Sequence, residues 1–177
     1  CNKDLTGAQT VNHDAIIFML NSLKDDQLIL MPTTNSAYGP GQDNNLCDET
    51  SPLNPISKYA SDKVAVEQQL MKRKNSISFR LATVFGMSPK MRIDLLVNDF
   101  VYRAVKDGFI VLYESHFKRN YIHIRDVSSV FIHAINNFEN MKGEIYNVGL
   151  SSANISKLEL CERIKLQIKN FIIMEAP

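Results

Sequence analysis

The 177-residue sequence is poor in the features that mark several classes of protein. Its three cysteines, Cys1, Cys47 and Cys161, lack CxxC spacing, and its four histidines lack HExxH spacing. We therefore expect no disulfide framework, no metal site and a reducing, cytoplasmic location. No apolar run approaches the ~20 residues of a membrane span, and a formal charge of +1 argues against a nucleic-acid partner. The expectation is a globular protein with neither membrane nor nucleic acid as a partner.

What the sequence does contain is an alternation of helical and strand patterns. Apolar residues at helical spacing predict helices over residues 10–23, 57–72, 94–106, 126–135 and 156–168. Short apolar runs predict strands at 28–31, 76–84 and 145–148. The first of these strands is expected to be buried on both faces and to end at Pro32. This alternation predicts an α/β fold with a largely parallel sheet.

Two tyrosine–lysine pairs lie within the predicted helices, Tyr59–Lys63 and Tyr102–Lys106. At this spacing a phenol and an ammonium share one helical face. A tyrosine normally titrates near pH ~10, and a cation beside it lowers that pKa, so that the tyrosine can transfer a proton near neutrality. Roughly one such pair is expected by chance in a chain of this composition, so the surroundings must decide which pair is functional.

The surroundings favour Tyr59. Tyr102 lies among apolar neighbours, and we expect it to be a structural tyrosine half in the core. Ahead of Tyr59, a predicted strand runs into a hydroxyl-rich end that contains Thr34, and open α/β sheets bind ligands beyond the carboxyl ends of their strands. The Thr34 hydroxyl, the phenol and the Lys63 ammonium together suit oxidation of a carbinol beside a nicotinamide.

Several short motifs occur in order along the chain. They are TTNSAYG at 33–39, YASDK at 59–63 followed by Glu67, RLATVFG at 80–86, RNYIHIRDV at 119–127 and YNVG at 146–149. In this order they resemble the extended short-chain dehydrogenase/reductases, specifically the NAD-dependent nucleotide-sugar epimerases and dehydratases such as UDP-glucose 4-epimerase. The resemblance covers nearly the whole chain. It implies a partial Rossmann-like, doubly wound parallel sheet and the start of a small C-terminal substrate-binding region.

The resemblance also implies roles for the residues of the first pair. Tyr59 would be the general acid and base, Lys63 would lower the tyrosine pKa and bind the nicotinamide ribose, and Thr34 would hold the reacting hydroxyl. Tyr59, Lys63 and Thr33 are the cofactor contacts implied by the resemblance. The cofactor would be NAD, and the sequence leaves NADP open as the alternative.

By the same resemblance, a nucleotide-sugar would be bound by residues from several motifs. Arg119 aligns with an arginine that grips the diphosphate, a task that suits the bidentate guanidinium. Thr83 stands where many relatives have an asparagine near the substrate, and Asp94 and Leu95 fall where the family opens a helix under the nucleotide base. The implied substrate contacts are Thr34, Asn35, Ser36, Thr83, Asp94, Leu95 and Arg119.

Two departures from the family limit these expectations. Asn35 and Ser36 occupy the place of the Asp-Glu pair of sugar 4,6-dehydratases, which argues against dehydration. The family also opens with Gly-x-x-Gly-x-x-Gly at a helix N-terminus that meets the pyrophosphate, and no three of the seven glycines here have that spacing. We therefore interpret the chain as truncated at both ends and expect it to bind NAD weakly by itself. Residues 1–86 would be the C-terminal half of the NAD-binding domain, and residues 87–177 an incomplete mixed region.

The favoured function is 4-epimerisation of a nucleotide-sugar, by transient oxidation to a 4-keto sugar and return of the hydride. One alternative is an NAD(P)H-dependent ketoreductase of the same fold, and another is a non-catalytic nucleotide-binding fragment. Relatives often dimerise through the helices that correspond here to residues 10–23 and 57–72, so a homodimer is expected. The sequence does not determine the sugar or the nucleotide base.

Overall fold

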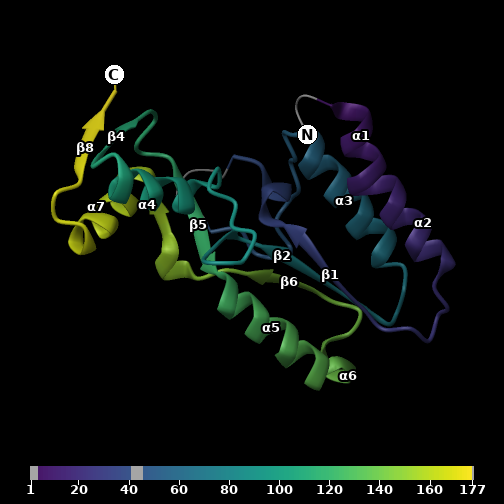
Figure 1. Ribbon diagram of the computed structural model, residues 1–177. Coiled ribbons are helices and arrows are strands. Elements are labelled where there is room, and N and C mark those ends of the chain that lie inside the picture. Colours follow the sequence, from purple (N-terminus) through teal and green to yellow (C-terminus); the bar gives the residue numbers. More distant parts are fainter. Residues whose placement is uncertain (1–3, 41–45, 177) are drawn as a thin grey trace. The chain divides into compact units, whose positions relative to one another are not determined.

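The computed structural model describes residues 4–40 and 46–176 (Figure 1). The helical segments are α1 (Leu5–Gln9), the π-helical turn η1 (Thr10–Asp14), α2 (Ala15–Ser22), the 3-10 turn η2 (Asn35–Tyr38), α3 (Lys58–Leu70), α4 (Leu96–Lys106), α5 (Ile124–Asn136), α6 (Phe138–Met141), the 3-10 turn η3 (Ser151–Ala153) and α7 (Lys157–Gln167). The strands are β1 (Ile29–Thr34), β2 (Ser76–Leu81), β3 (Thr83–Phe85), β4 (Phe109–Leu112), β5 (Lys118–His123), β6 (Ile145–Val148), β7 (Asn154–Ser156) and β8 (Ile172–Glu175). Within the described residues, none of the helices combines the length and the apolarity that a bilayer crossing requires.

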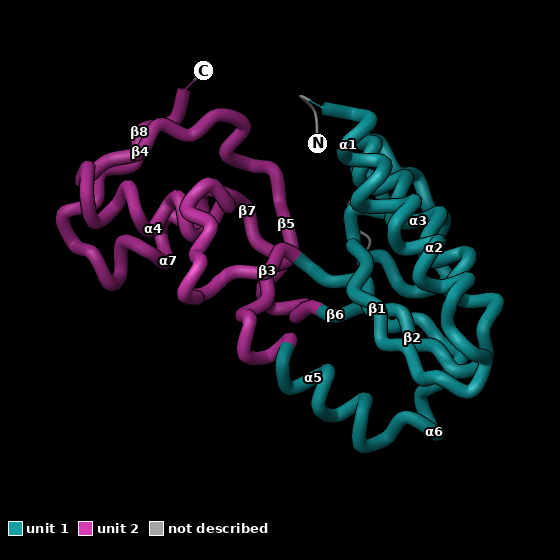
Figure 2. The backbone as a smooth tube through the Cα atoms, turned by 45° about the vertical axis from the view of Figure 1, so that its right-hand side comes forward, with its two compact units in different colours: residues 1–82, 128–148 teal, residues 83–127, 149–177 magenta. Residues whose placement is uncertain are grey.

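The chain divides into two compact units, each assembled from two stretches of sequence (Figure 2). Unit 1 spans residues 1–82 and 128–148, and unit 2 spans residues 83–127 and 149–177. The chain enters unit 2 at Thr83 and returns to unit 1 at Ser128, and the division expected after residue 86 stays a prediction. The return has a structural cause, because β6 completes the sheet of unit 1 by pairing with β2.

Unit 1 contains a three-stranded parallel sheet in the order β1–β2–β6, with helices on both faces (Figure 1). Successive side chains of a strand point to opposite faces. Ser78 and Arg80 of β2 therefore reach Glu67 of α3, whereas Phe79 packs against Phe131 of α5 with ring centroids 5.0 Å apart. Helices α1 and α2 pack beside α3. The predicted α/β class with a parallel sheet is confirmed.

Pro32 does not end the first strand, so the sequence analysis was wrong on this point. β1 continues through Pro32, which lies opposite Phe79 in the register, and ends at Thr34. In the described part of the chain β1 pairs with β2 alone, and an edge strand tolerates a residue that has no amide hydrogen to donate. As a result, Thr34 itself forms the carboxyl end of the strand.

Unit 2 has its own sheets and its own core. β3 and β5 are parallel, β5 and β7 are antiparallel, and β4 pairs with β8 in parallel. The core is built from apolar side chains of α4, α7 and the strands beside them, namely Val97, Phe100, Ala104, Ile110, Leu112, Tyr121, Ile155, Leu160, Cys161, Ile164 and Phe171. Helix α7 begins at a capping box, in which the Ser156 side chain accepts from the Glu159 amide (3.1 Å) and the Glu159 carboxylate accepts from the Ser156 amide (2.6 Å).

Candidate active site

Tyr59 lies in the first turn of α3, where Ser57 fixes the start of the helix. The Ser57 hydroxyl oxygen accepts a hydrogen bond from the Ala60 amide at 3.2 Å. This bond satisfies one of the amides that a helix start leaves without a partner. Tyr59 and Lys63 then follow four residues apart, so their side chains lie along one face of α3, and both are half-buried.

Thr34, at the carboxyl end of β1, is the direct partner of Tyr59. Hydrogen bonding from the Thr34 side chain lowers the pKa of the Tyr59 phenol and partly opposes the effect of burial. As the N-cap of η2, the Thr34 oxygen also accepts the Ser36 amide at 3.1 Å. A hydroxyl has one donor hydrogen besides its two lone pairs, so Thr34 can accept from the Ser36 amide and still donate to Tyr59. The fold thus brings together two residues that are far apart in the sequence, and Lys63 lies one helical turn from their contact.

Burial dominates the ionisation of both side chains of the pair. Loss of solvent raises the pKa of Tyr59 above its ordinary value, and the hydrogen bond with Thr34 offsets part of that rise. Burial also lowers the pKa of Lys63, because it disfavours the charged ammonium. The lowered Tyr59 pKa that the sequence analysis expected is not found in this structure. The shift is upward because desolvation outweighs the hydrogen bond.

The other predicted residues at this strand end have different surroundings. Thr33 is buried, and its hydroxyl donates to the Glu67 carboxylate at 3.1 Å. Asn35 is half-buried and Ser36 is exposed, both within η2. The Thr33 hydroxyl is thus engaged inside the protein. A cofactor contact for Thr33, and substrate contacts for Asn35 and Ser36, stay predictions.

The remaining predicted substrate residues belong to unit 2. Thr83 is half-buried at the start of β3, and Arg119 is exposed on β5. The exposed Asp94 carboxylate accepts hydrogen bonds of 2.5 and 3.1 Å from the Arg92 guanidinium, which lowers the pKa of Asp94. Leu95 is the N-cap residue of α4, which begins slightly later than the sequence predicted. Contact of these residues with a substrate stays a prediction.

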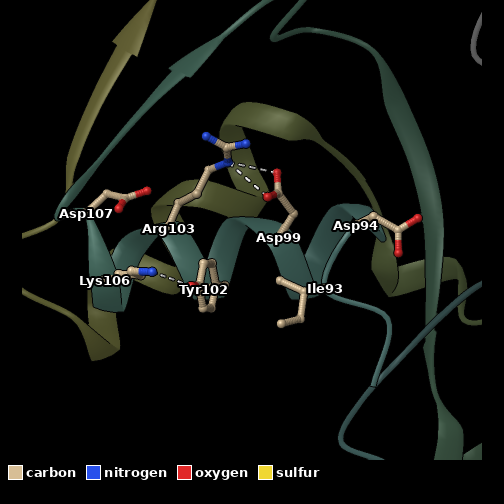
Figure 3. A pocket seen from close by; sticks show the side chains of 7 residues that line it. All are labelled: Ile93, Asp94, Asp99, Tyr102, Arg103, Lys106 and Asp107. Atoms are coloured by element: carbon tan, nitrogen blue, oxygen red, sulfur yellow. Dashed lines mark hydrogen bonds and ion pairs between the residues drawn. The ribbon is translucent and has the colours of Figure 1, made fainter. Parts of the chain in front are cut away.

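A pocket of about 400 Å³ lies beside α4 in unit 2 (Figure 3). It contains the second tyrosine–lysine pair, in which the Lys106 ammonium donates to the Tyr102 hydroxyl at 2.8 Å. Along the same helix, Nε of Arg103 donates to both oxygens of Asp99, at 2.9 and 3.0 Å. These polar groups are paired with neighbours four residues away, as on the solvated face of a surface helix. Asp94 also lines this pocket.

The structure adds a buried ion pair to which the sequence analysis gave no role. The Glu67 carboxylate on α3 accepts from Nη2 of Arg80 at 2.6 Å and from Nε of Arg80 at 3.1 Å. It also accepts from the Ser78 hydroxyl at 2.7 Å. Both Glu67 and Arg80 are almost fully buried. The available sequence signal was an arginine within an apolar strand, since a charge buried there requires a partner.

The same network continues from Arg80 to the loop that precedes α3. Nη1 of Arg80 donates to the Tyr38 hydroxyl at 2.8 Å, and the Tyr38 hydroxyl donates to Oδ1 of Asn147 at 2.7 Å. Nη1 of Arg80 also donates to the backbone carbonyl of Glu49 at 3.2 Å, and the Glu49 carboxylate accepts from the Asn147 amide at 2.6 Å. The network therefore links β2, β6, η2 and the loop around Glu49.

Comparison with known proteins gives a family match. The model of the “NAD dependent epimerase/dehydratase family” matches residues 8–149, a stretch that includes Thr34, Tyr59 and Lys63. A protein of Methanocaldococcus jannaschii named “Putative UDP-glucose 4-epimerase” is 26% identical over 174 residues, which cover 93% of this chain and 53% of that protein. The chain thus spans about half the length of that relative.

Solved structures share the fold at low sequence identity. The UDP-glucose 4-epimerase of Thermus thermophilus in complex with NAD matches with a TM-score of 0.81 and 22% identity, over 96% of this chain and 57% of that one. L-threonine dehydrogenase from Phytophthora infestans matches with a TM-score of 0.85 and 19% identity, over 99% of this chain and 60% of that one. These two proteins are named for different reactions, so the shared fold leaves the substrate open.

Proposed function

The chain belongs to the NAD dependent epimerase/dehydratase family, and on that premise we propose that it carries the proton-transfer residues of an enzyme that epimerises a nucleotide-sugar at C4. The observation that carries the proposal is the position of Thr34 at the carboxyl end of β1, from which its side chain acts on the Tyr59 phenol in the first turn of α3. Lys63 follows on the same face of α3. The relative from Methanocaldococcus jannaschii, by its name, supports a nucleotide-sugar as the substrate class.

In the proposed mechanism, Tyr59 handles the proton of the sugar hydroxyl. When bound, NAD would supply the acceptor, and then the donor, of the hydride of the sugar carbon. Tyr59 takes the hydroxyl proton during the oxidation and gives it back during the reduction. The Thr34 hydroxyl, which acts on the Tyr59 phenol, is proposed to orient that phenol and to contact the same sugar oxygen.

The side chain of Lys63 fits the ribose of a nicotinamide cofactor. Its ammonium offers three hydrogen-bond donors. Burial alone accounts for its lowered pKa, and no carboxylate pairs with it among the described residues. A half-buried ammonium of this kind is stabilised when neutral oxygens such as ribose hydroxyls accept its hydrogen bonds. Lys63 is therefore the proposed cofactor contact of this chain.

The raised pKa of Tyr59 favours its role as an acid over its role as a base. Burial keeps the phenol protonated at neutral pH, so that it is ready to donate a proton to a keto oxygen. Acting as a base requires positive charge beside the phenol. Lys63, one helical turn away, is the residue proposed to supply that charge.

The test is a turnover assay with a panel of UDP- and dTDP-sugars, using a form of the protein that binds NAD. We expect interconversion of C4 epimers without net formation of NADH, and a loss of about 10²–10⁴-fold in Tyr59→Phe. Unchanged turnover of Tyr59→Phe would contradict the proposal. Stoichiometric consumption of NADH or NADPH would instead identify a ketoreductase, and NAD binding without turnover would identify a non-catalytic protein.

A further inference from the structure

We propose that Glu67 and Arg80 form a positioning pair that holds the Tyr59 phenol against Thr34. The inference rests on the proposed role of Tyr59 and adds two residues that act on the site through others. It concerns contacts within unit 1 only. Neither residue is proposed to touch substrate or cofactor, because both side chains are almost fully buried and already hydrogen-bonded inside the protein.

Glu67 connects the helix that carries Tyr59 to the strand that carries Thr34. Tyr59, Lys63 and Glu67 follow at intervals of four residues, so they lie along one face of α3. The Glu67 carboxylate reaches across to the Thr33 hydroxyl of β1 at 3.1 Å. Thr33 immediately precedes Thr34, so this bond ties α3 to β1 one residue before Thr34.

Arg80 holds the chain on the other side of Thr34. Its guanidinium binds Glu67 through two nitrogens and donates to the Tyr38 hydroxyl at 2.8 Å. The guanidinium carbon also lies 5.1 Å from the centre of the Tyr38 ring. Tyr38 is the last residue of η2, the turn that Thr34 caps. The pair therefore secures Thr33 before Thr34 and Tyr38 after it.

A buried ion pair is suited to this task because its geometry is restrictive. Apolar contacts between a helix and a sheet tolerate small sliding movements, since they have no preferred direction. A bidentate guanidinium–carboxylate contact requires two hydrogen bonds in fixed orientation. Sliding α3 by one residue, about 1.5 Å, would separate Glu67 from its donors. Such a pair contributes to a unique arrangement more than to stability as such.

The bonding of Glu67 excludes the simpler interpretation that it is itself an acid or base. One carboxylate oxygen accepts from Thr33 and Ser78, and the other accepts from Arg80. This leaves the carboxylate fully engaged inside the protein. Its effect on Tyr59 must then pass through the position of α3 and β1.

The experiment measures the coupling between Thr34 and Tyr59 directly, without substrate or cofactor. Tyr59 ionisation is followed by near-ultraviolet phenolate absorbance, as the difference between each variant and the same variant carrying Tyr59→Phe. Thr34→Val is expected to raise the pKa of Tyr59, because it removes the hydrogen bond that lowers it. When Thr34→Val is added to the Glu67→Gln variant, we expect the pKa of Tyr59 to rise by less than half as much as in the wild-type background.

A milder variant and a matched control complete the test. Thr33→Val keeps the ion pair and removes the hydrogen bonds of the Thr33 hydroxyl to Glu67 (3.1 Å) and to Ser78 (3.0 Å), so it also should reduce the rise. Glu139→Gln makes the same change in an exposed ion pair of unit 1, with Lys142 at 2.6 Å, and should leave the rise intact. The proposal is overturned if Thr34→Val raises the pKa of Tyr59 as much in the Thr33→Val background as in the wild type. The same result in a Glu67→Gln background that still unfolds cooperatively also overturns it. If Glu67→Gln does not fold, the Thr33→Val background decides. Failure of Tyr59 as a catalytic residue would appear in turnover and leave this titration unchanged.

Discussion

The Lys106 ammonium donates a 2.8 Å hydrogen bond to the Tyr102 hydroxyl, whereas the hydrogen-bond partner of Tyr59 is Thr34. A direct hydrogen bond to the lysine four residues later is therefore a property of Tyr102 and does not mark Tyr59, the proposed catalytic tyrosine. The Tyr102 pair is a contact within one helix on the surface of unit 2, with Tyr102 38% exposed. The Tyr59 site instead depends on a strand end that another part of the chain supplies.

The two tyrosines provide a matched test of catalysis. Tyr59→Phe should reduce kcat by at least about a hundredfold, because the general acid and base is lost. Tyr102→Phe removes the same hydroxyl from the pocket beside α4 and should keep kcat within about twofold, the scale of a surface change of less than about 0.5 kcal/mol. Equal losses in both variants would show that the Tyr59 hydroxyl has no part in turnover that the Tyr102 hydroxyl lacks, and would contradict the proposed role of Tyr59. The measurement is steady-state turnover of the nucleotide-sugar that the substrate panel identifies.

The raised pKa of Tyr59 predicts how stability changes in alkali. A folded-state pKa above the unfolded value of 10.0 means that the folded protein holds this proton longer. The resulting stabilisation is fully present below the unfolded pKa and is lost as the pH rises through the folded pKa. Between the unfolded and the folded pKa, the free energy of unfolding of the wild type should thus fall more steeply with pH than that of Tyr59→Phe.

Urea unfolding across the alkaline range measures this slope. Thr34→Val serves as the control, because it keeps the phenol and removes the hydrogen bond that lowers the Tyr59 pKa. Its slope should be at least as steep as that of the wild type over the range in which Tyr59 titrates. Identical slopes in the wild type and in Tyr59→Phe would show that burial does not raise the pKa of Tyr59.

Two other tyrosines should respond to loss of their hydroxyls in opposite ways. The Tyr121 hydroxyl is buried and has no hydrogen-bond partner among the described residues. Tyr121→Phe should therefore leave the free energy of unfolding unchanged or raise it by about 1 kcal/mol. The Tyr38 hydroxyl forms hydrogen bonds with Arg80 and Asn147, so Tyr38→Phe should lower the free energy of unfolding by about 1–3 kcal/mol. A loss in Tyr121→Phe as large as that in Tyr38→Phe would refute this interpretation of the two sites.

Breaking the buried ion pair should cost far more stability than breaking an exposed one. Glu67→Gln should lower the free energy of unfolding by about 3–5 kcal/mol, because it leaves the Arg80 charge buried without its partner. Glu139→Gln disrupts an exposed pair with Lys142 and should change it little. Chemical denaturation of the two variants under one condition provides the comparison. A small effect of Glu67→Gln would indicate that water reaches Arg80.

Binding of NAD to the 177 residues alone is expected to be weak. No three glycines have the spacing of a pyrophosphate-binding turn, and the cofactor contact proposed for this chain, Lys63, is with the nicotinamide ribose. Isothermal titration calorimetry should give a Kd well above the micromolar range. A micromolar Kd would contradict the expectation. If Lys63→Met then lowered the affinity, the main cofactor contact would lie within this chain.

Features that depend on neighbouring residues were predictable from the sequence. The alternation of apolar periods indicated the α/β class, and the helix that carries Tyr59 was expected to begin at residue 57, which is its N-cap. The strand at 145–148 has the predicted bounds. Pro32 was misjudged because its tolerance depends on β1 pairing with one strand alone among those described. That pairing cannot be read from the residues around Pro32.

By itself, the sequence determined that Tyr59 and Lys63 share a helical face, since four-residue spacing and a helix suffice for that. Only the tertiary structure decided that Tyr59 bonds to Thr34, that its pKa rises, and that Glu67 and Arg80 lie between the helix and the sheet. Desolvation and buried hydrogen bonds depend on which distant residues cover a side chain. Local spacing contains no information about that cover, so these properties appear only when the chain is folded.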